Sequence, residues 1–386
     1  MSSKAFDYII IGSGASGLQL ALAMLRDTHF DDKMIGIIEK RTKFTNDKTW
    51  CYWETGQGLY DNIIHKSWNK GVFKANGETI PLNLAEYRYK MIKSIDFYTY
   101  AKSKIKTASN IQWIEDEITK SEENQDTVQL RGKHKTYSAK HIFDSRLPEN
   151  YKPKDSINIL QHFKGWFIKT EENVFNPDTF CMMDYDISDH EKTCFIYVLP
   201  FTKNKALVEF TYFSPEQVNE ETYEHYIKSY LKEKLNLAQY QIYEEEKGVI
   251  PMSSHPFYKH HRPKITKIGT SGGWVKASTG YSFKNAERNS IKIINNIKEG
   301  KSPHHHLYDK RFKHYDKMFL DVLYNHNEYG QTLFYKMYKY NDISQIFKFL
   351  DEQTKPLGEV KMMLTMTSFY FIKALLKHIA QGFKIK

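Results

Sequence analysis

The first forty residues have the clearest hydrophobic pattern in the chain. Residues 6–12 (FDYIIIG) form a short apolar run of strand-forming residues, as expected of a strand buried on both faces. Residues 18–27 (LQLALAMLRD) consist largely of strong helix formers, and residues 33–41 (KMIGIIEKR) contain a second buried strand. The pattern therefore predicts a βαβ unit at this end of the sequence.

The next stretch alternates between helix-like and strand-like patterns. Residues 89–105 (YKMIKSIDFYTYAKSKI) are predicted to form a helix. Residues 111–122 and 127–146 indicate consecutive strands of a meander that returns to the first sheet. From residue 157 to 212 the apolar period is two, and residues 201–205 (FTKNK) provide a turn between two strands.

The remaining segments are mainly helical. Residues 219–236 predict a charged helix, and residues 264–297 predict a strand, a glycine-rich loop and a helix. Beyond Gly300 the pattern is helical and rich in Tyr, Phe, Leu and Lys. No internal repeat or low-complexity linker separates the segments, so we expect interleaved units.

Gly12, Gly14 and Gly17 form a GxGxxG motif between the first strand and the first helix. The first glycine permits a tight turn, the second lets the backbone approach a pyrophosphate, and the third allows close helix–strand packing. Glu39 lies 22 residues after Gly17, at the end of the second strand, where a carboxylate accepts hydrogen bonds from ribose hydroxyls. The motif in this context predicts dinucleotide binding.

FAD is preferred over NAD because a second glycine-rich segment, residues 269–280, follows a late strand and precedes a helix. This arrangement resembles flavoproteins of the glutathione-reductase type, which build their FAD domain from distant segments. Thr270 stands where such proteins carry an acid. The expected cofactor contacts beyond the first motif are Arg146, Gly269, Thr270, Gly272, Gly273 and Gly280.

The predicted fold class is α/β, with a Rossmann-type FAD-binding domain interleaved with a β-sheet substrate domain and followed by a mainly helical C-terminal region. We assign residues 1–85, 128–165 and 262–300 to the FAD-binding domain. Residues 86–127 and 166–261 are assigned to the substrate domain. Residues 301–386 form the helical region, which is a candidate for membrane contact.

Composition narrows the functional classes. The 56 Lys and Arg against 46 Asp and Glu give a net charge of +10, which suits an anionic surface. No RNP, zinc-finger or basic-zipper pattern occurs, so a nucleic-acid partner is disfavoured. The three cysteines provide no disulfide framework, and no secretory signal or apolar run of about 20 residues is found, which indicates a cytosolic protein.

Several blocks, taken together and in order, resemble the lycopene β-cyclase family. They cover most of residues 5–285, whereas the C-terminal third is similar only in character. The blocks are DKTWCYWE (47–54), FDSR (143–146), QHFKGWFI (161–168), MMDYDI (182–187), FIYVLPFTKNKALVEFTYF (195–213), EKGVIPM (246–252) and GTSGGWVKASTGYSF (269–283).

The resemblance implies an enzyme that closes β-ionone rings on the open ends of lycopene, giving γ-carotene and β-carotene. Members of this family use reduced FAD, with NADPH or NADH as the source of electrons, although the reaction is an isomerisation with no net redox change. Lycopene and related carotenes are then the expected partners.

Glu209 is the candidate acid for this chemistry. Ring closure begins with a proton given to an unactivated alkene, so the donor must be a buried carboxylic acid with a raised pKa. Glu209 lies in the apolar run LVEFTYF and matches the acidic residue of the family block, with Phe210 where plant members carry a second acid. Taken alone, the alternating pattern also allows Glu209 to face solvent.

Aromatic residues of the family-like blocks are candidate walls of the substrate pocket, because aromatic faces stabilise cations. Ordinary core packing is the alternative for each of them. The candidates are Trp50, Trp53, Trp166, Trp274 and Tyr281.

Four other polar groups are weaker candidates for a catalytic, cofactor-binding or metal-binding role. Asp47 and Glu54 are each a possible second acid or an ordinary loop residue. Glu246 is expected to shape a turn near the flavin. Residues 304–306 (HHH) lack metal-ligand spacing, so no metal site is predicted.

The tail, residues 361–386, fits an interfacial helix. Leu364, Phe369, Ile372 and Leu376 recur at helical intervals. Basic residues accompany them, namely Lys373, Lys377, Lys384 and Lys386. We therefore expect peripheral attachment to the inner face of the cytoplasmic membrane, with packing of this helix on the protein's own core as the alternative.

Two other functions stay open at this point. One is an FAD-dependent redox enzyme, such as a hydroxylase or prenyl-chain reductase, acting on a hydrophobic isoprenoid. The other is a non-catalytic carotenoid- or flavin-binding protein. The sequence does not specify ring type, the number of ends cyclised, the final proton acceptor or the oligomeric state.

Overall fold

The computed structural model describes residues 4–41, 45–148, 151 and 156–380. Its first seven-stranded sheet contains the predicted βαβ unit and has the order β8-β2-β1-β11-β10-β9, with β17 beside β11. Strands β8, β2, β1, β11 and β17 are parallel neighbours, whereas β9 and β10 join in antiparallel fashion. The bounds are β1 (Lys4–Ile11), β2 (Ile35–Glu39), β8 (Ile111–Glu115), β9 (Ile118–Glu123), β10 (Val128–Gly132), β11 (Thr136–Asp144) and β17 (Ile265–Lys267).

Helices cover one face of this sheet. They are α1 (Ala15–Leu25), α2 (Ser94–Lys106) and α4 (Phe283–Lys298). Ile10 of β1 packs with these helices, whereas Ile9 and Ile11 pack with residues of β9 and β10 on the opposite face. This alternation explains why the first strand is apolar throughout.

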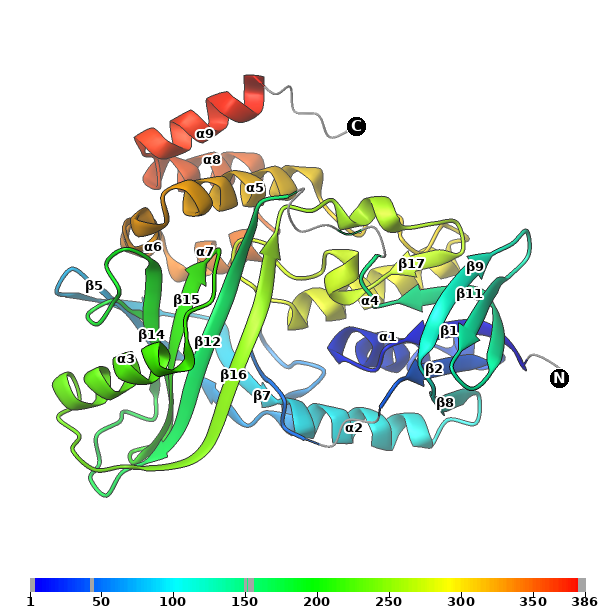
Figure 1. Ribbon diagram of the computed structural model, residues 1–386, viewed down its shortest axis with the longest axis horizontal. Coiled ribbons are helices and arrows are strands. Elements are labelled where there is room, and N and C mark those ends of the chain that lie inside the picture. The colour runs from blue at the N-terminus through cyan, green and yellow to red at the C-terminus, as the bar shows by residue number, and fades with distance from the viewer. Residues whose placement is uncertain (1–3, 42–44, 149–150, 152–155, 381–386) are drawn as a thin grey trace.

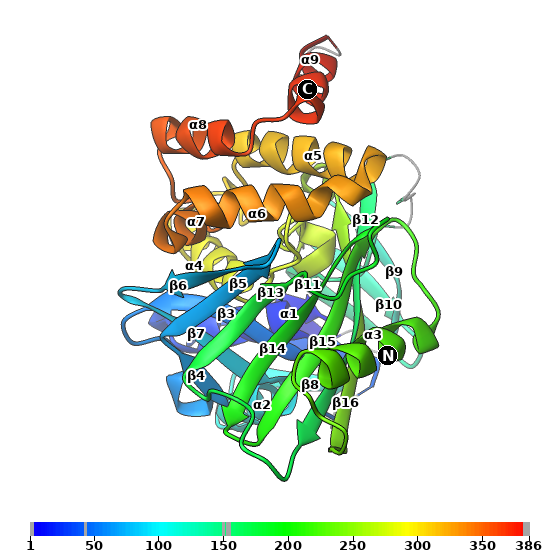
Figure 2. The same ribbon diagram turned by 90° about the vertical axis from the view of Figure 1, so that its left-hand side faces the viewer.

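The second seven-stranded sheet has the order β16-β12-β15-β14-β13-β5-β6 (Figures 1 and 2). It is antiparallel except where β13 runs parallel to β5. The predicted turn joins β14 to β15 and is confirmed. The bounds are β5 (Lys70–Ala75), β6 (Glu78–Asn83), β12 (Asn158–Lys169), β13 (Thr179–Asp184), β14 (Thr193–Thr202), β15 (Lys205–Ser214) and β16 (Gln241–Ser253).

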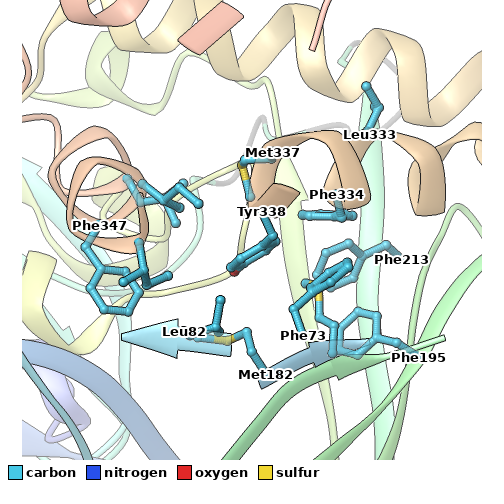
Figure 3. Packing of buried hydrophobic residues seen from close by; sticks show 14 of the residues in the cluster. Phe73, Leu82, Met182, Phe195, Phe213, Leu333, Phe334, Met337, Tyr338 and Phe347 are labelled. Atoms are coloured by element: carbon cyan, nitrogen blue, oxygen red, sulfur yellow. The ribbon is translucent and has the colours of Figure 1, made fainter. Parts of the chain in front are cut away.

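Two helical layers cover the second sheet. The predicted charged helix is α3 (Glu220–Glu233), which packs on one face. The other face meets the C-terminal helices through a large apolar core, where Phe73 stacks on Tyr338 with ring centroids 4.6 Å apart (Figure 3). The C-terminal helices are α5 (Lys310–Asn325), α6 (Gly330–Tyr340), α7 (Ile343–Leu350), α8 (Pro356–Thr365) and α9 (Phe369–Ala380).

A small three-stranded sheet lies between the two large ones. Its strands are β3 (Thr49–Thr55), β4 (Lys66–Trp68) and β7 (Tyr87–Lys93), in the order β3-β7-β4. The predicted helix over residues 89–105 is therefore wrong in its first part. Most residues of β7 are buried, and the strand pairs with β3 and β4, so the helix α2 begins only at Ser94.

Strand pairing also moves three of the predicted domain boundaries. Residues 70–83, assigned to the FAD-binding domain, form β5 and β6 at an edge of the second sheet. Residues 94–123, assigned to the substrate domain, form α2, β8 and β9 of the first unit. Residues 158–165 belong to β12 of the second sheet. The cause is that the chain crosses between the sheets more often than the pattern indicated.

Candidate active site

The glycine motif after β1 has the local geometry that a dinucleotide requires. Gly12 has a φ of +98°, and a β-carbon on Gly17 would lie 2.0 Å from the carbonyl oxygen of Gly12, so α1 packs tightly against the strand. A β-carbon on Gly14 would meet nothing within 4 Å, which leaves open space at the N-terminus of α1. Such a helix N-terminus favours a phosphate group.

Glu39 lies beside this motif, as predicted. It ends β2, and its Oε2 accepts hydrogen bonds from the Ser13 amide at 2.7 Å and the Ser13 hydroxyl at 3.0 Å. The carboxylate is therefore held at the edge of the loop, in the position from which it would accept from a ribose.

The late glycine segment meets the first motif. After β17 it forms the short helix η5 (Gly269–Gly272), and a β-carbon on Gly269 would lie 3.2 Å from the Ser16 hydroxyl of α1. Gly269, Gly273 and Gly280 have positive φ values, and a β-carbon on Gly272 would lie 2.5 Å from the Lys267 carbonyl oxygen. Both glycine segments therefore form one surface fit for a dinucleotide.

Arg146 is engaged elsewhere. Its guanidinium donates to Asp144 Oδ1 at 2.9 Å, to the Ile118 carbonyl at 2.8 Å and to Ser121 Oγ at 2.5 Å. These contacts tie β11 to β9, and Arg146 does not line the cavity described next. Its predicted contact with the cofactor is not supported, because the arginine serves an ion pair within its own sheet.

A cavity of about 350 Å³ lies between the second sheet and the late glycine segment. Thr270 and Gly280 contribute to its wall from the late segment, and Trp50 contributes from β3. Helices α6 and α7 close another side with Phe334, Tyr338 and other apolar residues. Further lining residues are Phe163, Met182, Met183, Phe195, Leu207 and Phe213, so the wall is largely apolar.

Two carboxyl groups meet in this apolar cavity. Glu209 of β15 and Glu246 of β16 are both paired with Gly165 of the intervening strand β12. Because Gly165 has no side chain, the carboxyl groups reach each other and form a hydrogen bond. Thr211 Oγ1 donates to Glu209 Oε1 at 2.7 Å, and Thr49 Oγ1 donates to Glu246 Oε2 at 2.5 Å.

Burial controls the protonation of this pair. Glu209 is only 7% exposed. Burial raises the pKa of its carboxyl group well above the ordinary value, and the charge of Glu246 adds to this rise. Burial also raises the pKa of Glu246 to about 7, although the hydrogen bond from Thr49 opposes the change. Two carboxyl groups in contact share a proton, so Glu209 remains a neutral acid at neutral pH.

Two of the aromatic candidates line the cavity. Trp50 stacks on Phe283 with centroids 5.2 Å apart. The hydroxyl of Tyr281 lies 3.1 Å from that of Tyr89, which lies 2.7 Å from that of Tyr197. Burial holds the pKa values of all three tyrosines above the ordinary value, so they remain neutral.

The other three tryptophans lie outside this cavity wall. Trp53 stacks on Phe347 at 4.3 Å, and its indole donates to Asp351. Trp274 is buried with the helices of the first sheet. Trp166 follows Gly165 and therefore points to the opposite face of the second sheet, where it packs with α3, so its predicted place in the pocket is wrong.

The other polar candidates differ in whether they line the cavity. Asp47 lines the cavity and accepts from the Tyr98 hydroxyl at 3.0 Å, whereas Glu54 is paired with Lys90 and Lys284. Glu246 was expected to shape a turn but is half of the carboxyl pair. The alternating pattern of β16 could have indicated this role, because Glu246 occupies one of the inward positions of the strand. No group of three metal-ligating side chains occurs among the residues described.

A comparison with protein families gives one match, which extends over nearly the whole chain. The family model described as lycopene cyclase protein matches residues 7–376. None of the curated protein sequences gives a match.

Solved structures show the same fold at low sequence identity. A geranylgeranyl bacteriochlorophyll reductase-like protein from Thermoplasma acidophilum is 13% identical, with a TM-score of 0.60 over 98% of this chain and 100% of its own. A flavoprotein/dehydrogenase from Cytophaga hutchinsonii is 11% identical, with a TM-score of 0.58 over 94% and 99%. A flavin-dependent brominase is 11% identical, with a TM-score of 0.56 over 98% and 100%. These likenesses confirm the predicted fold class.

Proposed function

Because the chain belongs to the lycopene cyclase family, we propose that it closes β-ionone rings on the acyclic ends of lycopene, giving γ-carotene and β-carotene without net redox change. The observation that carries the proposal is a neutral, buried Glu209 in an apolar cavity. An alkene accepts a proton only from an acid held out of water and aimed at the carbon. The burial of Glu209 in this apolar cavity supports the first of these conditions.

The glycine segments fit FAD. Gly12, Gly14, Gly17 and Glu39 would hold the adenosine diphosphate part, and residues 269–273 would hold the part nearest the cavity. When bound and reduced, FAD would supply negative charge that stabilises a carbocation, and NADPH or NADH would keep it reduced. The chain's own residues perform the proton transfer.

The cavity wall protects the cation that protonation creates. Trp50, Phe163 and Tyr281 present aromatic surface around the carboxyl pair. A well-placed aromatic face stabilises a cation by roughly 0.5–2 kcal/mol, and exclusion of water prevents its capture as an alcohol. The apolar wall also suits a hydrocarbon substrate.

Access to a lipid-dissolved substrate requires docking on a membrane, and α8 and α9 support this. They lie at the outer end of the helical layer (Figure 2). Several of their apolar residues are exposed, namely Leu357, Val360, Leu364, Phe369, Ile372, Leu375 and Leu376. Lys384 and Lys386 lie outside the described residues. No helix in the described part of the chain is long and apolar enough to span a bilayer. The exposed apolar residues of α8 and α9 are what support the proposed peripheral attachment at the cytoplasmic face.

The test is an anaerobic assay with pre-reduced FAD and lycopene in liposomes, with products separated by chromatography. The wild-type protein should form ringed carotenes, and Glu209→Gln should form none while retaining FAD. A redox enzyme acting on an isoprenoid would instead consume reductant in proportion to product. Failure to form rings, or full activity of Glu209→Gln, would contradict the proposal.

A further inference from the structure

Ring closure needs a base as well as an acid. The donor gives a proton to one carbon of the terminal alkene, and the second alkene attacks the resulting cation to close the ring. The ring cation must then lose a proton from an adjacent carbon to form the ring double bond. The carbon that gains a proton and the carbon that loses one in forming a β-ring are both bonded to the same quaternary carbon, so donor and acceptor must lie side by side.

We propose that Glu246 is the base that removes this proton, and that it returns the proton to Glu209 through their hydrogen bond. This inference rests on the proposed function. The step balances, since the C–H bond of the ring cation breaks, its electron pair forms the ring double bond, and the proton passes to the Glu246 carboxylate. Transfer to Glu209 then restores the starting pair with no external acid or base.

The geometry of the pair supports this division of roles. Glu209 and Glu246 both line the cavity and come from strands separated only by β12. Their hydrogen bond provides the return path, because Gly165 leaves the space between them open. Thr49 donates to Glu246 Oε2, which orients the carboxylate from the side of β3.

The charges around Glu246 favour a base. Glu244 lies on the same face of β16, but its carboxylate binds Lys93 at 2.6 Å and Asn46 at 2.6 Å. Lys93 is thus already paired, and no ion pair to Glu246 occurs among the described residues. Cys51 and Glu209 are the other titratable groups that face Glu246. The Glu246 carboxylate can therefore accept a proton.

The experiment compares Glu246→Gln, Glu246→Asp and a control, Glu245→Gln, with the wild type, each loaded with reduced FAD and supplied with lycopene in liposomes. Glu245 is the control because it lies on the opposite face of β16, where its carboxylate pairs with Lys164. A general base contributes about 10²-fold or more, so Glu246→Gln should lower kcat by that factor with KM little changed. The cation should then lose other adjacent protons, so rings with the double bond elsewhere should appear. Glu246→Asp should recover part of the rate and the β-ring, and Glu245→Gln should resemble the wild type.

The pH profile is the second readout. The wild-type rate should rise with pH as Glu246 ionises and fall as Glu209 loses its proton, and Glu246→Gln should lack the rising limb. Wild-type rate and exclusive β-rings from Glu246→Gln would overturn the inference alone. Equal losses in Glu246→Gln and Glu245→Gln, with the product ring unchanged, would also overturn it. A wild-type protein that forms no rings would overturn the proposed function as well.

Discussion

Gly165 lies directly beside Glu209 in the pairing of β12 with β15, and a β-carbon built on Gly165 would lie 3.2 Å from the Cβ of Glu209. It would also lie 2.8 Å from a methyl of Leu207. The absence of a side chain at this one position is what allows carboxyl groups from β15 and β16 to meet. The acid therefore depends on a residue that has no functional group.

Gly165→Ala should reduce both stability and ring formation. The added methyl must displace Leu207 and Glu209, and overpacking of this kind costs about 1–3 kcal/mol. Urea unfolding measures the stability, and the anaerobic assay measures the activity. Gly358→Ala in α8 is the control, because a β-carbon there meets nothing within 4 Å. Wild-type activity in Gly165→Ala would show that the carboxyl pair is not needed.

Stability should depend on pH through Glu209. Its pKa is raised in the folded protein, so its contribution is complete below the ordinary value of 4.5 and is lost as pH rises toward the raised value. The Glu209→Gln variant has no ionisable group at this position, so it does not lose this contribution to stability as pH rises. The free energy of unfolding of the variant relative to wild type should therefore increase from pH 5 to 8, by at most about 1.4 kcal/mol per pH unit. A difference that stays constant with pH would contradict the raised pKa.

Two glycine substitutions should separate cofactor binding from folding. Gly14→Ala places its methyl in open space, so the melting temperature of the apoprotein should remain near that of wild type while FAD affinity falls at least about tenfold. Gly17→Ala forces a contact with the Gly12 carbonyl and should lower both. Flavin absorbance after purification and thermal unfolding of the apoprotein measure the two effects. Unchanged FAD binding in Gly14→Ala would argue against the predicted phosphate site.

Membrane attachment should depend on the exposed apolar residues of α8 and α9. Leu364→Glu and Phe369→Glu together should lower binding to anionic liposomes several-fold, because a charged side chain resists transfer to the lipid interface. Raised salt should weaken wild-type binding. The control is Ile291→Glu on α4, which is also exposed but lies outside the helical layer. Unchanged liposome binding in the double variant would contradict the docking surface.

Point substitutions are preferable to removal of the tail. Met362 and Met366 of this segment belong to the main apolar core. Glu359 is fully buried and accepts from the Tyr315 hydroxyl at 3.0 Å. Truncation after Pro356 would therefore disturb the fold itself.

Trp166 and Trp50 should respond differently to replacement. Trp166→Phe should leave the rate of ring formation near that of wild type, because the indole lies on the face of the sheet covered by α3. Trp50→Phe should lower the rate, since its indole lines the cavity. Steady-state assays of both variants provide the comparison. An equal loss of rate in both would mean that the two effects arise from packing alone.

The sequence was most informative where the chemistry is local. The motif formed by Gly12, Gly14, Gly17 and Glu39 could be located because its strand, turn and helix are consecutive in the sequence. Each of its glycines is required by the backbone or the space in its immediate surroundings. The hairpin of β14 and β15 was predicted for the same reason. Glu209 could be found because it lies in an apolar run and also matches the acidic residue of the family block, since the alternating pattern alone left its direction open.

The features that were missed depend on pairing between distant strands. Nothing near Glu246 in the sequence shows that β16 lies one strand away from β15, or that Gly165 leaves the space between them empty. Trp166 was misplaced because its direction depends on the register of β12, which a shift of one residue reverses. The contacts of Arg146 could not be predicted, because its partners on β9 are 25 to 28 residues away.

The cavity is lined by residues from Asp47 to Leu350, so the helices α6 and α7 that close it are synthesised after Glu209 and both glycine segments. A nascent chain of 300 residues contains the glycine motifs and Glu209 but lacks α6 and α7. Until those helices leave the ribosome and pack, water reaches the carboxyl group and Glu209 behaves as an ordinary carboxylate. The neutral, buried acid therefore forms only once α6 and α7 have packed over the cavity.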